Sequence, residues 1–286
     1  LGLLARVTHM PLPLVYHLAR VVAGWLLLMA VYCLAAQVMT NVGARRAALL
    51  LTATASGLGW LWRAGPGQPN PIDYGPGLVM PEAITFLTLL LNPLFALSVF
   101  LLIVLYLAAA HAFATGSVRA GLLAGAAALV LGNIHSYDVI PAAVALGAFL
   151  VYLLLARRAG GRAVLLALLI AAMAAPSLLH QLWLQRTGEV SILVKAVDQP
   201  PSPEPLYVAL GFGVPLALAV VGLLRAVRGN DWARLLALWL VIGFALIYAP
   251  LGFQRKLIEG LQVPICVLAI LALAPRWERR PRQTAL

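Results

Sequence analysis

Long apolar segments occupy most of this chain, and their length is the feature that most restricts its fold. Nine segments are close to the length of a transmembrane helix, with approximate boundaries 14–36, 46–62, 93–114, 119–134, 139–156, 163–184, 205–225, 232–250 and 257–274. A helix of about 20 apolar residues crosses the hydrocarbon core of a bilayer. Hydrophobic residues make up 63% of the sequence and charged residues 10%, which excludes a soluble globular domain. The sequence therefore predicts an all-α integral membrane protein of about nine transmembrane helices, with residues 1–286 forming a single polytopic domain.

Threading the nine segments alternately across a bilayer sorts the charges. One side receives two acidic and thirteen basic residues, so its charge of +11 equals the formal net charge of the whole chain. The basic residues are Arg45, Arg46, Arg119, Arg157, Arg158, Arg162, Arg225, Arg228, Arg234, Arg276, Arg279, Arg280 and Arg282. The other side receives seven basic and seven acidic residues. By the positive-inside rule the first side is cytoplasmic, so we expect residue 1 outside and the C-terminus inside. Because the basic residues cluster at the ends of apolar segments, without interleaved aromatic residues, the sequence excludes nucleic-acid binding.

The sequence assigns no metal ligand. Cys33 and Cys266 lie inside apolar segments, far from any partner spacing, so neither a disulfide framework nor a thiolate metal site is indicated. The chain carries no phosphate-binding loop, dinucleotide fingerprint or metalloprotease motif. No cofactor is assigned, and a divalent cation is left open.

Two irregularities indicate a polar cavity on the outer side. The apolar run from Pro81 to Asn92 is too short to span and predicts a re-entrant or interfacial helix. The segment 119–134 is also short, at roughly 24 Å for a rise of about 1.5 Å per residue. We therefore expect its end, from Gly132 to Asp138, to lie below the outer surface, where polar groups survive only inside protein or beside a wet pocket.

His135 and Asp138 are the most informative pair at that end. Three residues apart, they can share a helical face and form an Asp–His contact. A carboxylate beside an imidazole can orient it, hold it charged or act as a general base. The alternative is that Asp138 caps the following helix and that His135 is an interfacial residue.

Arg255 and Lys256 form a second candidate cluster, in the sequence Phe253-Gln254-Arg255-Lys256. Two adjacent cations at the outer end of a span run against the positive-inside bias. At a helix N-terminus they would make a site for a phosphate or diphosphate. The alternative is that both side chains extend to lipid headgroups.

Three more candidates come from the first half of the chain. His17 and Arg20 lie near the outer end of the first span and share a face. An arginine at that depth needs either an acidic partner or an anionic ligand. Glu82 opens the short run after Pro81, where it is either an acid in the first turn of a helix or a ligand for a hydroxyl or cation.

Three stretches resemble a known family: Val15-Tyr16-His17-Leu18-Ala19-Arg20, Pro81-Glu82 to Asn92-Pro93, and Phe253-Gln254-Arg255-Lys256 with Glu259-Gly260-Leu261-Gln262-Val263-Pro264. Together they are similar to bacterial multi-pass proteins of the GT-C glycosyltransferase superfamily, especially its mannosyltransferase-like and RgtA/B/C/D-like members. The resemblance implies transfer of a sugar from a polyprenyl-phosphate donor to an acceptor at the extracytoplasmic face of the bacterial inner membrane. In that family the catalytic carboxylate lies in the first outer loop. We therefore expect the chain to be the C-terminal part of a longer protein.

The resemblance also suggests roles for the candidate residues. The lipid phosphate would contact Arg255, Lys256, Gln254 and Arg20. The sugar and acceptor cavity would include His17, Tyr74 and Tyr137, with Asp138, His135 and Glu82 as the candidate catalytic groups. The expected partners are membrane lipids and a polyprenyl-phosphate-linked sugar, and no nucleic acid.

Two other classes of function remain open. In a transporter or lipid flippase, intramembrane His and Asp would relay protons. Such a protein should place ionisable groups near the membrane midplane, whereas the candidates here lie in the outer half. A membrane scaffold without a small-molecule site is the third possibility.

Overall fold

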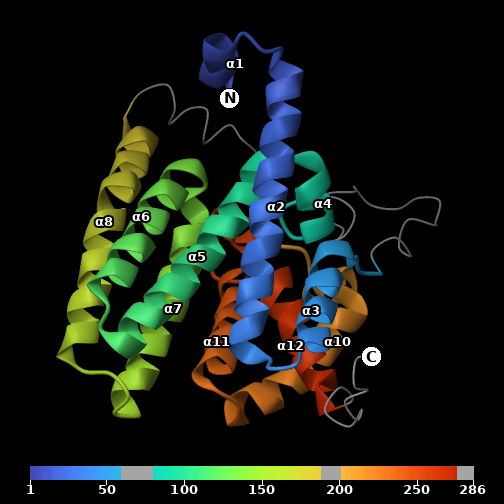
Figure 1. Ribbon diagram of the computed structural model, residues 1–286, viewed down its shortest axis with the longest axis vertical. Coiled ribbons are helices and arrows are strands. Elements are labelled where there is room, and N and C mark those ends of the chain that lie inside the picture. Colours follow the sequence, from blue (N-terminus) through green and yellow to red (C-terminus); the bar gives the residue numbers. More distant parts are fainter. Residues whose placement is uncertain (59–79, 188–200, 276–286) are drawn as a thin grey trace, which may run out of the picture. The chain divides into compact units, whose positions relative to one another are not determined.

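The computed structural model describes residues 1–58, 80–187 and 201–275, and within these ranges the regular structure is helical, without strands. The α-helices are α1 (Gly2–Thr8), α2 (Leu12–Val38), α3 (Val42–Thr54), α4 (Thr85–Leu91), α5 (Pro93–Thr115), α6 (Val118–Ile134), α7 (Val139–Leu155), α8 (Gly161–Arg186), α10 (Pro205–Arg228), α11 (Asp231–Leu246) and α12 (Gln262–Leu273) (Figure 1). Two short 3-10 helices are η3 (Ser136–Asp138) and η4 (Gln254–Ile258). The predicted all-α class is confirmed for this part of the chain.

Six helical segments of the described chain are long and apolar enough to cross a membrane: Leu12–Val38, Pro93–Thr115, Ser136–Leu155, Gly161–Leu184, Pro205–Arg228 and Gln254–Leu273. They support the predicted multi-pass membrane character and do not confirm nine spans. The predicted short segment 119–134 is also helical, as α6, which has 17 residues.

The segment predicted as a span over 46–62 has a different structure. α3 has 13 residues and ends at Thr54, so at about 1.5 Å per residue it is roughly 20 Å long. Its C-cap Ala55 is extended, with φ −67° and ψ 134°, and residues 56–58 are not helical. The last four residues of the predicted span, 59–62, lie outside the residues that the structure describes. The helix ends where Gly57 packs against the backbone carbonyl of Gly211, an approach that leaves no room for a side chain at position 57.

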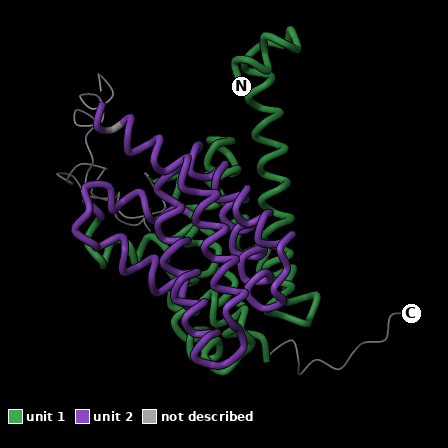
Figure 2. The backbone as a smooth tube through the Cα atoms, turned by 90° about the vertical axis from the view of Figure 1, so that its left-hand side faces the viewer, with its two compact units in different colours: residues 1–100, 203–237, 260–286 green, residues 101–202, 238–259 purple. Residues whose placement is uncertain are grey.

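The described chain forms two compact units (Figure 2). Unit 1 comprises residues 1–100, 203–237 and 260–286, and unit 2 comprises residues 101–202 and 238–259. The boundaries fall inside α5 and α11, so each of these helices contributes to both units. The prediction of a single polytopic domain stays a prediction, and each unit is described by itself below.

In unit 1, α10 packs closely on α12 through a glycine. A Cβ atom added to Gly222 would lie 2.1 Å from the carbonyl oxygen of Leu268, a backbone atom. Small residues permit such close helix–helix approach in membrane proteins. α10 is broken at Gly213, whose φ of 58° and ψ of −138° are not helical, two residues before Pro215. At this break, the carbonyl of Leu210 accepts a hydrogen bond from Leu58 N at 2.8 Å.

Gln262, the first residue of α12, connects two other segments of unit 1. Its side chain is 3% exposed, and its Oε1 accepts a hydrogen bond from Thr85 N in the first turn of α4. Its Nε2 donates to the carbonyl of Ala55, at the C-terminal end of α3, over 2.8 Å. One amide thus satisfies an N-terminal donor of α4 and a C-terminal acceptor next to α3, groups that have no partner inside their own helices.

α4 occupies most of the run 81–92 that was predicted as a short helix, and it begins at Thr85. Its C-terminal carbonyls accept hydrogen bonds from α2. Tyr16 Oη donates to Leu91 O over 2.6 Å, and the Arg20 guanidinium donates to Leu90 O. These contacts supply partners for carbonyls that a helix C-terminus leaves unpaired.

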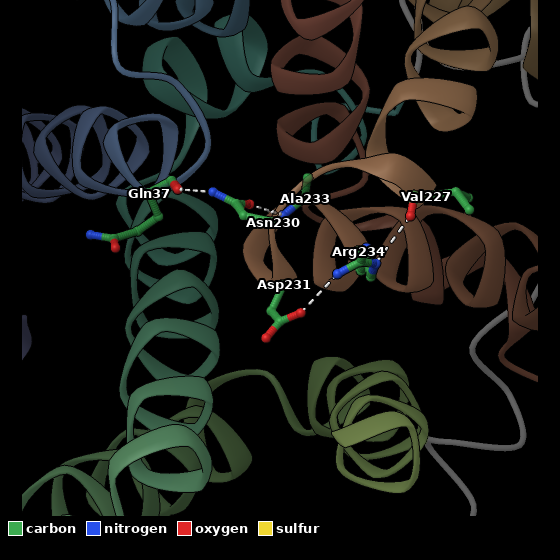
Figure 3. Close-up of polar contacts among 6 residues, drawn as sticks. All are labelled: Gln37, Val227, Asn230, Asp231, Ala233 and Arg234. Atoms are coloured by element: carbon green, nitrogen blue, oxygen red, sulfur yellow. Dashed lines mark hydrogen bonds and ion pairs between the residues drawn. The ribbon is translucent and has the colours of Figure 1, made fainter. Parts of the chain in front are cut away.

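Asn230 joins three helix ends of unit 1 (Figure 3). Its Oδ1 accepts from Ala233 N at 2.9 Å, which caps α11, and its Nδ2 donates to Gln37 O at the end of α2 over 2.8 Å. Arg234 donates to Val227 O near the end of α10 and forms a 2.9 Å ion pair with Asp231. The three helix ends are therefore tied by side-chain contacts.

We expect Asn230→Ala to lower the free energy of unfolding by about 1–2 kcal/mol, because it removes a helix cap and a second hydrogen bond. Unfolding of the protein in mixed micelles, followed by circular dichroism, measures the change. The control is Asn133→Ala, because the exposed Asn133 amide donates only to Leu129 O of its own helix. A loss of similar size in the control would contradict the prediction.

In unit 2, α6 packs closely on α8, again through glycines. Cβ atoms added to Gly125 and Gly132 would lie 2.4 Å from Met173 Sδ and 2.2 Å from Ser177 Oγ. The core of this unit also contains Tyr106 and Trp239, whose rings stack with centroids 4.3 Å apart. This packing fixes the end of α6, where the candidate site begins.

Candidate functional site

The site begins where α6 ends. α6 stops at Ile134, His135 adopts φ −151° and ψ 77°, and the chain makes the single turn η3 before α7 starts at Val139. Pro141 lies in the first turn of α7, where a missing backbone N–H costs no helical hydrogen bond. The local sequence thus turns the chain within a few residues and brings His135 and Asp138 together.

His135 contacts two carboxylates of unit 2. Its Nδ1 lies 3.1 Å from Asp138 Oδ2 and 3.0 Å from Glu259 Oε2. The side chains of Asp138 and Glu259 are 1% and 0% exposed, and that of His135 is 14% exposed. Nδ1 therefore faces one oxygen of each carboxylate. One nitrogen of His135 and one carboxylate oxygen each of Asp138 and Glu259 all lie within 4.8 Å of one another.

The two carboxylates set the charge of His135. Burial lowers the pKa of the imidazole, but the contacts with Asp138 and Glu259 outweigh it and raise the pKa to about 11. In the protein without a bound ligand, His135 is therefore positively charged at neutral pH. The predicted Asp–His contact is present in the structure.

The alternative role considered for Asp138, as a helix cap, is not what the structure shows. Asp138 occupies the N-cap position of α7, but its side chain makes no capping hydrogen bond. Both of its oxygens are buried without a hydrogen-bond partner among the described residues. Such groups are costly in a protein interior unless they bind something else.

Tyr137 links this cluster to the cationic turn η4. Its ring lies edge-on to His135 with centroids 6.0 Å apart, and it packs on Phe253 at 5.0 Å. Lys256 Nζ lies 4.6 Å from the ring centroid of Tyr137, in a cation–π contact. Two clusters that the sequence suggested separately are therefore neighbours in unit 2.

The sequence predicts that Arg255 and Lys256 lie at the start of an α-helix, and this prediction is wrong. Gln254, Arg255 and Lys256 belong to the 3-10 helix η4 and are half-buried, whereas α12 begins at Gln262. Gly260, with φ 76°, turns the chain between the two helices. An anion site at these side chains would therefore depend on their own charges.

The remaining candidates lie elsewhere. His17, Arg20 and Glu82 belong to unit 1, and Tyr74 lies outside the described residues. His17 is exposed, with its ring 5.9 Å from that of Tyr16. Arg20 donates to a helix carbonyl, which is neither of the partners expected for it, and its phosphate role stays a prediction. Glu82 lies in a turn before α4 rather than in the first turn of that helix, so the helix-dipole explanation for it is wrong.

Sequence reasoning missed Glu259 as a member of the cluster. In the sequence it stands out only as the first residue of the stretch Glu259 to Pro264 that resembles the GT-C family. One signal was available in the sequence: Glu259 is an acidic residue inside the apolar, membrane-length segment Gln254–Leu273. A carboxylate in such a segment is energetically costly unless it has a partner. The contact of Glu259 with His135 could not be predicted, because the two residues are far apart in the sequence and their separation carries no information on distance in space.

An apolar cavity of about 230 Å³ lies within unit 2. It is lined by residues of α5, α6, α7 and α8, including Leu105, Ala128, Val139, Leu146, Ile170 and Ala174. Val139 directly follows Asp138, so the cavity and the buried carboxylate share one turn of the chain. Unit 2 thus combines an anionic cluster, a cationic turn and an apolar cavity.

This combination can perform two kinds of chemistry. The carboxylates and imidazole can hold a proton or a cation, and the lysine and arginine can attract an anion. Among the described residues, the groups for proton or cation binding lie at His135, Asp138 and Glu259, and the groups for anion binding lie on η4. The chain matches no protein family, no curated protein and no solved structure.

Proposed function

We propose that the chain is part of a GT-C-like membrane glycosyltransferase that takes a sugar from a polyprenyl-phosphate donor at the extracytoplasmic face of a bacterial inner membrane. Arg255 and Lys256 bind the lipid phosphate, and His135 and Asp138 act on the sugar and acceptor. The single observation that carries the proposal is the contact of Tyr137 with both His135 and Lys256. It connects a group capable of acid–base chemistry with a cation suited to a leaving phosphate.

The charges at the site support this assignment. When a glycosidic bond to phosphate breaks, negative charge develops on the phosphate oxygens, and fixed cations stabilise it. Charge-assisted contacts are stronger where water is partly excluded. Arg255 and Lys256 are half-buried and next to each other on η4, which suits this role.

The apolar cavity supports the choice of a lipid-linked donor. It is lined almost wholly by aliphatic side chains and alanine, with Phe113 as its aromatic residue. Its volume of about 230 Å³ holds only a short part of a polyprenyl chain. Because Val139, the residue after Asp138, lines the cavity, an isoprenoid bound there would bring its phosphate end toward the polar residues of the site.

The orientation in the membrane is part of the proposal. Nine spans, with α4 as a re-entrant or interfacial helix, would put the cation-rich connections in the cytoplasm and the C-terminus with them. The thirteen basic residues on that side, against two acidic ones, support this arrangement, because cytoplasmic loops retain positive charge. The donor phosphate and the acceptor would then meet the protein from the opposite side.

Binding of a polyprenyl phosphate to the purified protein in nanodiscs tests the phosphate role directly. We expect Arg255→Ala with Lys256→Ala to weaken binding by about 100-fold, since each charge-assisted contact contributes roughly 1.5 kcal/mol or more. The matched polyprenol, which lacks the phosphate, should bind both proteins equally.

The control removes two exposed cations of unit 2, Arg119→Ala with Arg157→Ala, and should leave phosphate binding unchanged. Equal weakening by both double variants would show a general charge effect. Unchanged binding and unchanged sugar transfer in the Arg255/Lys256 variant would refute the assigned role.

A proton-coupled transporter or lipid flippase is the second candidate. The observation that favours it is His135 between two buried carboxylates, an arrangement that can hold and release a proton. Proton-coupled uptake into vesicles that Asp138→Asn abolishes, together with unchanged polyprenyl-phosphate binding in the Arg255/Lys256 variant, would reverse our preference.

A further inference from the structure

Three side chains of unit 2, those of His135, Asp138 and Glu259, converge, with one nitrogen or oxygen atom of each within 4.8 Å of the others. Nδ1 of His135 stands at 3.0–3.1 Å from one oxygen of Glu259 and one of Asp138. The Asp138 carboxylate, 1% exposed, points into this cluster without a hydrogen-bond partner among the described residues.

We propose that His135, Asp138 and Glu259 bind one divalent cation through Nδ1 and one oxygen of each carboxylate. The site needs no residue of unit 1 and no lipid substrate. It is therefore a property of this chain whether or not the chain transfers a sugar.

The two separations from His135 Nδ1 to one oxygen of each carboxylate fit a shared ion. Nitrogen and oxygen ligands lie about 2.0–2.2 Å from a zinc ion. Two such ligands at angles of about 90–110° are separated from each other by roughly 3.0–3.4 Å. The two contacts of His135 Nδ1 fall at the short end of this range.

The charges fit as well. A divalent cation balances the charges of two carboxylates, and it binds the imidazole in its neutral form. A buried pair of carboxylates is otherwise expensive, because desolvation and mutual repulsion both oppose ionisation. Lys256 Nζ lies over the ring of Tyr137, 4.6 Å from its centroid.

The ligand types indicate the kind of metal. One imidazole and two carboxylates suit Zn²⁺ or Mn²⁺, whereas Mg²⁺ and Ca²⁺ favour sites built from oxygen. Three protein ligands leave at least one coordination position for water or for an anionic ligand. We therefore expect Zn²⁺ to bind more tightly than Mn²⁺, and Mg²⁺ more weakly than both.

Isothermal titration of the chelator-treated protein in detergent with Zn²⁺ or Mn²⁺ tests the proposal. We expect one ion per chain and at least 100-fold weaker binding in Asp138→Asn and in Glu259→Gln, which preserve side-chain size. The matched controls Asp231→Asn and Glu204→Gln should bind as the unsubstituted protein does. Their carboxylates lie outside unit 2.

X-ray absorption of the zinc-loaded, unsubstituted protein keeps the proposal testable if a variant fails to fold. We expect a coordination shell of nitrogen and oxygen that includes one imidazole. The proposal is overturned by a shell without imidazole, by no binding below millimolar concentrations, or by equal binding in folded Asp138→Asn and Glu259→Gln. Because polyprenyl phosphate is absent from both measurements, their failure would leave the proposed transferase to be tested by its own experiment.

Discussion

Gly222→Ala is expected to destabilise unit 1 by about 3 kcal/mol, at the upper end of what overpacking costs. The added methyl group would lie 2.1 Å from Leu268 O and 2.7 Å from Leu268 C. Both are backbone atoms of α12, so no side-chain rotation can relieve the clash. α10 and α12 would have to separate, and the buried contacts along both helices would weaken together.

Unfolding in mixed micelles measures the loss, and Gly147→Ala is its matched control. Gly147 also lies inside a helix, α7, but an added Cβ meets no atom within 4 Å. Alanine there should raise stability slightly, by up to about 1 kcal/mol, because it reduces the freedom of the unfolded chain. Equal stability of the two variants would contradict the close contact between α10 and α12.

Gln262→Met is expected to lower the free energy of unfolding by about 2–5 kcal/mol. Methionine matches glutamine in size, but it can neither accept from Thr85 N nor donate to Ala55 O. Each buried backbone group left without a partner costs about 1–3 kcal/mol. The cost persists in a membrane, where lipid offers no replacement hydrogen bond.

The control for this variant is Gln37→Met. Gln37 is exposed, and only its backbone carbonyl takes part in the contact with Asn230. We expect a change within about 0.5 kcal/mol there. Hydrogen exchange at the start of α4 provides a second readout, because Thr85 N should lose protection only in the Gln262 variant. Retained protection would show that another acceptor replaces the glutamine.

Apolar length predicted several elements of this fold closely. The ranges expected for α2, α5, α7 and α8 differ from those observed by a few residues at each end, and the short α6 was expected as such. Hydropathy succeeds here because long helices in this chain are set by the requirement to cover apolar surface. The same signal failed at α3, where the contact of Gly57 with Gly211, distant in sequence, ends the helix.

The site was predictable only in its local parts. The pairing of His135 with Asp138 follows from their spacing of three residues. The cationic character of η4 follows from the adjacent residues Arg255 and Lys256. The addition of Glu259 and the stacking of Lys256 on Tyr137 depend on which helices are neighbours. Charge patterns indicate the side of a membrane for each segment, but they carry no information on lateral arrangement.

The break in α10 has a consequence for the order in which the protein is made. Leu210 O receives its hydrogen bond from Leu58 rather than from its own helix, and Pro215 has no N–H to offer Gly211. The ribosome completes the segment around Leu58 about 150 residues before it reaches α10. At typical elongation rates this interval lasts roughly ten seconds or more. The partner segment is therefore already synthesised when α10 is made, so the carbonyl of Leu210 can be paired as soon as the two segments meet.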